Sequence, residues 1–532
     1  MALDVLIRNG QLIDGTGNPW LRADVGILDG RVASVGVLGD EPARRVIDAR
    51  GLYVCPGFVD MHAHSDLQLL VQPEWEVKLA QGVTLEVIGQ DGLGIAPLTD
   101  EIVAPLRQQL TAWNGDPPEI DWTWRSMADY LARFDGRVSP NVACLVGHGT
   151  IRMQVMGMDD RAPSDAELRQ MQAVVRQAMS DGAVGLSAGL TYAPAVFSED
   201  DELVELCRPL VEWGGHYQPH HRNYGAGALE AYAASIDIGR RANVPVHLTH
   251  AHMSTPANRG RGPELLRLVS ESRAHGVDVT LDSYPYLAGN TYLHASLPSW
   301  VHIGGNSAIL DRLRDPDTRQ RIEAEMDAVD WSHIVLASVS RAESRRFVGS
   351  SVADAAHAAG KPSAFDFYCD LLVDNALGVG AINFIGIEEN VRTILQHPAH
   401  MAGSDGIVVG DRPHPRAWGT FARYLSEYVR ELGLVRLEEM VRKMTGLPAQ
   451  RLGLVDRGLI RPGFAADVVC FDALHVRDRA TYEHPRQAPD GIPYVLVNGE
   501  VVVDNHQHTG KKPGRVLRRS PRPGSPPGSP IH

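Results

Sequence analysis

A His-x-His pair follows a short apolar run near the start of the chain. Residues 57–66 read Gly-Phe-Val-Asp-Met-His-Ala-His-Ser-Asp, which places His62 and His64 at the end of that run. Because alternate residues of a strand point to the same face, both imidazoles can reach one metal ion. Imidazole is a good ligand for Zn²⁺ and related metals. Taken alone, the pair could equally be two polar residues at an exposed strand end.

Three further residues of metal-ligating types lie at the ends of other apolar runs. His220 and His250 each end a candidate strand, and Asp405 lies in the stretch Ser-Asp-Gly at a strand-to-loop junction. The carboxyl ends of the strands of a (β/α)₈ barrel converge on one mouth, so these side chains can share a site with the His-x-His pair. Each has a plainer explanation, since His can be a core residue and Asp-Gly a turn. Together they favour a metal site.

The elements that must position these residues alternate between two patterns. Short apolar runs, typical of buried strands, are separated by longer segments with helical periodicity. This alternation predicts an α/β fold with a parallel sheet or a (β/α)₈ barrel. The apolar runs are 54–59, 85–88, 142–146, 184–186, 244–248 and 277–281, and the helical segments include 165–180 and 264–274.

Both ends of the chain have a different sequence pattern. Residues 3–50 contain short strand-like runs with an Asn-Gly turn signal at Asn9, and a second Asn-Gly turn at Asn498 lies between strand-like runs near the C-terminus. One sheet built from both ends would explain this similarity.

Composition excludes several classes of protein. The 532 residues include 51 Lys plus Arg and 65 Asp plus Glu, a formal net charge of −14, so we expect no broad binding to nucleic acid or to anionic membranes. Five scattered Cys residues give no disulfide framework. The N-terminal residues do not read as a secretory signal, and no run of about 18 apolar residues is present, so a cytoplasmic location is expected.

The order of His62-x-His64, His220, His250 and Asp405 resembles the amidohydrolase superfamily. Finer motifs resemble its N-acyl-D-amino-acid deacylase (D-aminoacylase) branch, and the likeness runs from about residue 5 to residue 505. These motifs are Gly-His-Gly-Thr (147–150), Gly-Leu-Ser-Ala-Gly-Leu-Thr-Tyr (185–192), Tyr-Pro-Tyr-Leu-Ala-Gly (284–289) and His-Pro-Arg-Ala-Trp-Gly-Thr-Phe (414–421).

The resemblance implies a metal-dependent (β/α)₈ TIM barrel with a small β-sandwich formed by both chain termini. Together with a break in the strand–helix alternation and the composition of the last residues, the resemblance predicts five segments. They are the N-terminal part of the sandwich (1–55), the catalytic barrel (56–455), an insertion in it near 290–370, the C-terminal part of the sandwich (456–510), and a disordered basic tail rich in Pro, Gly and Ser (511–532).

The resemblance also implies the metal ligands. A tightly bound Zn²⁺ would use Asp91, His220 and His250, while His62, His64 and Asp405 line a second, weaker position. Asp91 stands in Gly-Gln-Asp-Gly where the branch carries a ligating Cys in Gly-Asn-Cys-Gly. Because a carboxylate is a harder ligand than a thiolate, the preference for zinc is expected to weaken. Alternatively, Asp91 is only a turn residue.

Catalytic and substrate-binding roles follow from the same resemblance. Asp405 would take a proton from water and deliver it to the leaving nitrogen, and Tyr192 would hydrogen-bond the carbonyl oxygen. The branch holds the substrate α-carboxylate with a Lys, a Tyr, a Ser and an Arg. The corresponding residues here are His252, Tyr284, Asn290 and Arg416.

A His in place of the Lys weakens carboxylate binding, unless protonated His252 supplies the missing charge. His252 could also shuttle protons. The expected function is hydrolysis of N-acyl-D-amino acids or related small amides by a metal-activated water. One alternative is a cyclising condensation, in which a pendant amine of an amine-bearing amide attacks the carbonyl and water is lost. Another is a non-catalytic scaffold. The expected partner is a small amide, and the oligomeric state stays open.

Overall fold

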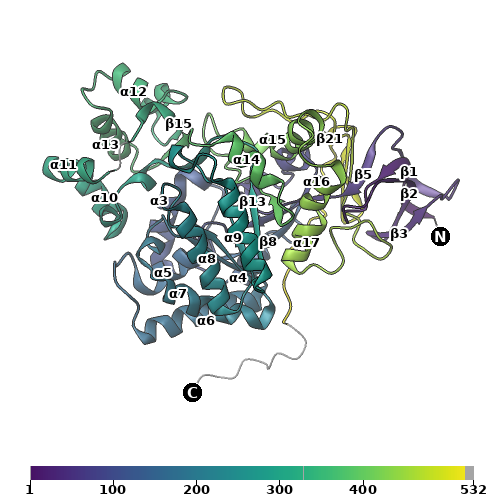
Figure 1. Cartoon of the computed structure of the whole chain (residues 1–532), viewed down its shortest axis with the longest axis horizontal. Helices are drawn as coiled ribbons and strands as arrows, with labels where there is room; N and C mark the ends of the chain where they lie inside the picture. The colour runs from purple at the N-terminus through teal and green to yellow at the C-terminus, as the bar shows by residue number, and fades with distance from the viewer. Residues whose placement is uncertain (1, 327–328, 522–532) are drawn as a thin grey trace.

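The computed structural model describes residues 2–326 and 329–521. Within these ranges a barrel of eight parallel strands occupies the middle of the chain (Figure 1). Each strand is short and buried, as expected for a parallel sheet covered by helices. The barrel strands are β6 (Phe58–Asp60), β7 (Val83–Ile88), β8 (Asn141–Cys144) with its continuation β9 (Val146–Gly147), β10 (Gly185–Gly189), β11 (His216–His220), β12 (Val246–Leu248), β13 (Val279–Ser283) and β17 (His400–Ala402).

The barrel closes where its first and last strands meet. Regular pairing joins β6 to β7 and β8, and a second run joins β9 through β13 to β17. Between β17 and β6 no such ladder forms among the described residues. The seam has a backbone hydrogen bond from the N–H of Met61 to the oxygen of Ala402 (3.2 Å) and a bridge between Ala63 and Gly406. The seam thus lies directly under His62 and Asp405.

Helices cover the outside of the barrel. In α6, Ser164 forms a capping box with Glu167, and Met171, Val175 and Ala178 lie on the buried face. The helix ends at Gly182, whose φ of +117° favours glycine. The helices of this part are α1 (Gln68–Val71), α2 (Glu76–Leu79), α3 (Asp100–Asn114), α4 (Met127–Leu131), α5 (His148–Met156), α6 (Asp165–Asp181), α7 (Asp200–Cys207), α8 (Ala228–Ala242), α9 (Gly262–Ala274), α14 (Glu388–Leu395), α15 (Arg416–Arg423), α16 (Leu437–Met444) and α17 (Gly446–Leu452).

Strands from the two ends of the chain form one sheet, drawn in purple and yellow in Figure 1. The β structure expected from both chain ends is present, and its nine strands are joined in one sheet because β1 pairs with β4 through residues 3–8 and with β5 through residues 11–12. The strands are β1 (Leu3–Leu12), β2 (Leu21–Leu28), β3 (Arg31–Gly36), β4 (Ala43–Asp48), β5 (Tyr53–Pro56), β18 (Val468–Phe471), β19 (Tyr494–Val497), β20 (Glu500–Asp504) and β21 (Gln507–His508).

Residues 289–383 form a lobe beside the barrel mouth (Figure 1). An antiparallel sheet and four helices enclose a hydrophobic cluster of their own, which includes Leu313, Leu336 and Leu372. The sequence placed an insertion near 290–370. The strands are β14 (Gly289–Tyr292), β15 (Ile334–Val339) and β16 (Val379–Asn383), and the helices are α10 (Gly305–Arg314), α11 (Pro316–Glu325), α12 (Val352–Ala358) and α13 (Ala364–Asp374).

The C-terminal segment differs from the expected disordered tail over residues 511–521. Val516 and Leu517 are buried, and the backbone N–H of Leu517 donates to the oxygen of Val142 (2.8 Å). These apolar side chains extend the barrel cluster, which a composition rich in Pro and Arg does not reveal. Residues 522–532 lie outside the described residues. Within the described chain, no helix has the length and apolar character needed to cross a membrane.

Candidate metal centre

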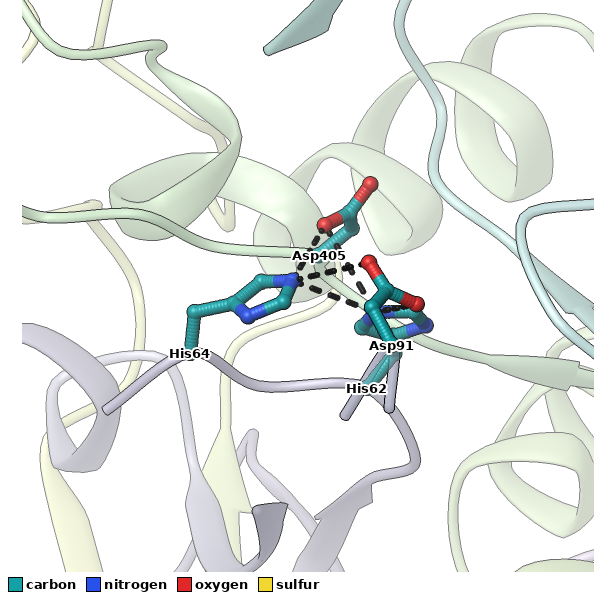
Figure 2. Close-up of side chains that lie close together, drawn as sticks. All are labelled: His62, His64, Asp91 and Asp405. Carbon is teal, nitrogen blue, oxygen red and sulfur yellow. Dashed lines mark hydrogen bonds and ion pairs between the residues drawn. The ribbon is translucent and has the colours of Figure 1, made fainter. Parts of the chain in front are cut away.

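Two clusters of ligand-type side chains lie at the carboxyl ends of the barrel strands. One contains His62, His64, Asp91 and Asp405, and the other contains Asp91, His220 and His250. In each cluster the candidate ligand atoms lie within 4.8 Å of one another. Figure 2 shows the first cluster, with the four side chains pointing toward a common centre. Asp91 belongs to both, so the two positions adjoin.

The spacing of the ligand atoms fits a bound metal ion. Two ligands on a tetrahedral zinc ion lie about 3.4 Å apart when each bond is about 2.1 Å. In the first cluster the Nε2 atoms of His62 and His64 are 3.3 Å apart, and the two lie 3.6 Å and 3.1 Å from Oδ1 of Asp405. In the second, Nδ1 of His220 is 3.0 Å from Nε2 of His250.

Asp91 faces both clusters with both oxygens. Its Oδ1 lies 3.6 Å from Nε2 of His62 and 3.7 Å from Nε2 of His250. Its Oδ2 lies 3.5 Å from Nε2 of His64 and 3.7 Å from Nδ1 of His220. These separations exceed a hydrogen bond, and Oδ1 is buried with no hydrogen-bond partner. A cation shared with the histidines would satisfy this oxygen, so the residues present fit a zinc ion.

Three of the candidate ligand residues have strained backbone conformations. Asp91, His250 and Asp405 have φ of 54°, 29° and 50°, in the left-handed region that non-glycine residues rarely adopt. Such conformations cost on the order of 1–3 kcal/mol each and cluster at functional sites. The strain aims these side chains into the barrel mouth.

Further side chains orient the imidazoles of the candidate ligands. The Oγ of Thr191 bonds Nε2 of His220 (2.8 Å), and the hydroxyl of Tyr224 bonds Nδ1 of His250 (3.0 Å). Because the outward nitrogen of each ring has a partner, the inward nitrogen is directed toward Asp91. Neither Thr191 nor Tyr224 was among the predicted site residues. Thr191 adjoins Tyr192 in a recognised motif, whereas Tyr224 has no sequence signal.

The two carboxylates strongly affect the histidines around them. Burial opposes the charged imidazole of His64, but hydrogen bonds to Asp405 and Asp91 outweigh it and raise its pKa to about 9. Burial also opposes the charge of Asp405, but Arg416 and the histidines hold its pKa well below the usual range. Protons and a metal ion therefore compete for this cluster, and metal binding would release protons.

The candidate catalytic residues line one cavity of about 260 Å³ at the barrel mouth. Asp91, His220 and His250 line it together with Tyr192 and Asp405. The hydroxyl of Tyr192 is 3.0 Å from Oγ of Thr291, on β14 of the lobe. The lobe thus completes the wall of the site. His252, Tyr284 and Asn290 also line this cavity.

Arg416 has a different neighbourhood from the one expected for a free carboxylate anchor. Its side chain is fully buried, and Nη1 forms an ion pair with Oδ2 of Asp405 at 3.0 Å. The guanidinium lies 4.4 Å from the ring centre of Tyr284, and Nη2 donates to the backbone oxygen of Asn290 (3.3 Å). In this arrangement its charge stabilises ionised Asp405.

His252 lies against the same tyrosine. Its ring centre is 4.1 Å from that of Tyr284, and Nε2 accepts a hydrogen bond from the backbone N–H of Tyr284 (3.3 Å). Burial, His250 and Arg416 lower the pKa of His252 to about 3. A metal ion on His250 would lower it further. His252 is therefore neutral near pH 7. This favours the interpretation that the site binds a substrate carboxylate weakly over the interpretation that protonated His252 replaces the missing lysine.

The sequence profile described as the Amidohydrolase family matches residues 45–503. The D-aminoacylase of Alcaligenes xylosoxydans xylosoxydans is 38% identical over 520 residues, which is 97% of this chain and 98% of that protein.

Two solved structures share the whole fold. One is the N-acyl-D-glutamate deacylase from Bordetella bronchiseptica, complexed with zinc and a phosphonate inhibitor that mimics the tetrahedral intermediate. It is 36% identical with a TM-score of 0.84, and the match covers 97% of this chain and 100% of that one. The other is a D-aminoacylase studied for its binuclear metal centre, in which one metal activates and a second attenuates (36% identity, TM-score 0.83, 97% and 100% coverage).

Proposed function

Because the chain belongs to the amidohydrolase family, we propose that it is a zinc-dependent deacylase that hydrolyses the amide bond of N-acyl-D-amino acids. The observation that carries this proposal is the pair of ligand clusters that share Asp91 beside Tyr192 and Asp405 in one cavity. The relatives that act on N-acyl-D-amino acids support the substrate class.

Asp91, His220 and His250 would hold the tighter ion, and His62, His64 and Asp405 the weaker one. Zinc held there lowers the pKa of water and polarises the amide carbonyl. Asp405 accepts the proton of the attacking water, because Arg416 keeps its carboxylate ionised. It then delivers this proton to the leaving nitrogen, which departs as a neutral amine.

Tyr192 acts on the carbonyl oxygen. Burial, with the nearby carboxylate of Asp91, raises the pKa of Tyr192 above its usual range, so the phenol stays protonated. Its hydroxyl is held by Thr291, at the edge of the cavity that Asp405 also lines. A hydrogen bond from it would stabilise the negative charge that develops on the oxygen as water adds.

The part of the cavity lined by His252, Tyr284 and Asn290, here called the amine side, binds the amino-acid part of the substrate in this proposal. Tyr284 lines the cavity there and buried Arg416 lies against its ring, while His252 is neutral and Asn290 carries no charge. Since Arg416 already pairs with Asp405, its attraction for a substrate carboxylate is shared. Simple N-acetyl-D-amino acids should therefore be hydrolysed with a high KM.

The test combines metal analysis with product analysis. The purified protein is assayed for zinc and then incubated with N-acetyl-D- and N-acetyl-L-amino acids and with amine-bearing amides in ¹⁸O-water. Hydrolysis places ¹⁸O in the released acetate, whereas a cyclising condensation yields a product lighter by one water. The proposal expects labelled acetate, mainly from the D-enantiomers, and loss of turnover after chelation. A zinc-loaded protein that releases no acetate from any of these substrates would refute it.

A further inference from the structure

A buried lysine lies beneath the barrel mouth, outside the cavity. Lys78, on α2, is 1% exposed. Its Nζ donates to Oδ2 of Asp60 (2.5 Å) and to Oγ of Ser404 (2.5 Å). Ser404 donates in turn to Asp60, from its hydroxyl to Oδ2 (2.6 Å) and from its backbone N–H to Oδ1 (2.8 Å). The three side chains form a closed hydrogen-bonded triangle, here called the seam clamp.

The seam clamp bridges the two strands that the barrel leaves without a regular ladder. Asp60 is the last residue of β6, and Ser404 follows β17. Oδ1 of Asp60 also accepts the backbone N–H of His62 (3.2 Å), and Ser404 directly precedes Asp405. A shift of one strand against the other would therefore change the distance between the His-x-His pair and Asp405.

A second carboxylate ties the clamp to His64. Glu86, on β7, has Oε1 at 3.4 Å from Nζ of Lys78, and its Oε2 accepts the hydroxyl of Ser65 (2.9 Å). Ser65 directly follows His64. Burial opposes the charge of Lys78, but Asp60 and Glu86 outweigh it and raise its pKa, so Lys78 stays cationic. Lys78 thus contacts three residues that are each connected to one ligand of the weaker position. Asp60 bonds the backbone of His62, Ser404 precedes Asp405, and Glu86 bonds Ser65, which follows His64.

We propose that Lys78 is a positioning residue that, through Asp60 and Ser404, fixes His62 and His64 relative to Asp405 and thereby sets the zinc affinity of that position. This inference rests on the proposed metal-dependent function. Metal ligands must be held to about 0.5 Å, and loss of groups that orient them typically reduces metal affinity 10–100-fold.

Lys443 supplies a matched control. It is also fully buried, but its Nζ donates to the backbone oxygens of Leu395 (2.9 Å) and His397, away from the ligand clusters. Replacing either lysine with Met removes a buried hydrogen-bond donor and keeps most of the side-chain volume. Both variants should lose stability, and only Lys78→Met should also lose zinc affinity.

The experiment measures zinc binding to metal-free protein by competition with a chromophoric chelator at pH 8, alongside thermal unfolding. For Lys78→Met we expect the weaker of two binding steps to fall about 10–100-fold and the tighter step to change less than about threefold. Lys443→Met should leave both within about threefold. In a His64→Ala background, Lys78→Met should have no further effect on zinc, because the position it supports is already lost.

The outcomes separate the inference from the proposed function. If wild-type protein binds no zinc, the proposed function fails. If it binds zinc and Lys78→Met matches Lys443→Met, or if both binding steps fall together, Lys78 is merely structural and the inference is overturned. Should Lys78→Met not fold, Ser404→Ala carries the test, because it removes the hydroxyl that bonds both Lys78 and Asp60. Unchanged zinc binding in that variant would equally overturn the inference.

Discussion

Replacing His252 with Lys tests whether the amine side of the cavity lacks a cation. His252 and Arg416 lie against the same ring, with His252 4.1 Å and the guanidinium 4.4 Å from the ring centre of Tyr284. A lysine ammonium here would face a substrate carboxylate that reaches Tyr284. His252→Lys should lower the KM for N-acetyl-D-amino acids.

The magnitude follows from Coulomb's law. Opposite charges about 4 Å apart attract by about 4 kcal/mol at an effective dielectric constant of about 20. Desolvation of the ammonium and repulsion by Arg416 oppose this attraction, which leaves roughly 1.4–2.8 kcal/mol. Each 1.4 kcal/mol is a factor of ten, so KM should fall about 10–100-fold.

The assay compares an N-acetyl-D-amino acid with its neutral carboxamide, using wild type, His252→Lys and His252→Gln. The gain should occur only for the acid and only with Lys. An equal gain with Gln or with the carboxamide would refute the charge argument. Since the pKa of His252 is about 3, the wild-type KM for the acid should also stay flat from pH 6 to 8. A KM that rises across that range would show that protonated His252 already binds the carboxylate.

Three further predictions concern the metal, the proton carrier and stability. His220→Ala should remove most zinc and activity together, whereas His221→Ala, next to it but bonded to Ser235 on α8, should retain zinc by elemental analysis. Asp405→Asn should keep the tighter zinc ion and lower kcat about 10²–10⁴-fold; a variant with most of wild-type kcat would contradict its role. Burial lowers the pKa of Lys443 to about 7, so between pH 7 and 10.5 the unfolded state binds more protons and the free energy of unfolding should rise with pH. Urea unfolding at several pH values should show this slope, at most about 1.4 kcal/mol per pH unit, and Lys443→Met should abolish it.

The sequence predicts the barrel and brings five of the six candidate ligands to its mouth because these depend on local patterns, whereas Asp91 was identified only through the family resemblance. Apolar runs end where the strands end, so His220 and His250 fall at the mouth in the structure as they do in the pattern. The pairing of Arg416 with Asp405 could not be predicted from the sequence. An arginine at this position can either bind a substrate carboxylate or pair with Asp405, and only the packing of the folded chain decides between the two. Tyr224 was missed for a similar reason, since it lies in a loop with no periodicity.

The seam clamp shows a second limit of sequence reasoning. Lys78 lies in a short helix and reads as an ordinary surface lysine, and Asp60 and Ser404 read as neighbours of more informative residues. Their roles depend on the contact between Asp60 and Ser404. These two residues are 344 positions apart in the chain and meet only because the barrel closes there. A contact that closes the barrel has no local signature in the sequence, although its residues lie beside the His62-x-His64 motif and Asp405.

Asp91 shows how the structure changes the interpretation of a residue that differs from the family pattern. Judged by hardness alone, a carboxylate in place of a thiolate weakens the preference for zinc. In the structure each of its two oxygens faces one histidine of each cluster, at 3.5–3.7 Å. A thiolate would have to serve both positions through one sulfur atom, whereas this carboxylate has two oxygens and each lies near both clusters. The residue that departs from the pattern is therefore placed to contact both positions, and it does so from a turn in which Asp91 and Gly92 both have positive φ (54° and 71°).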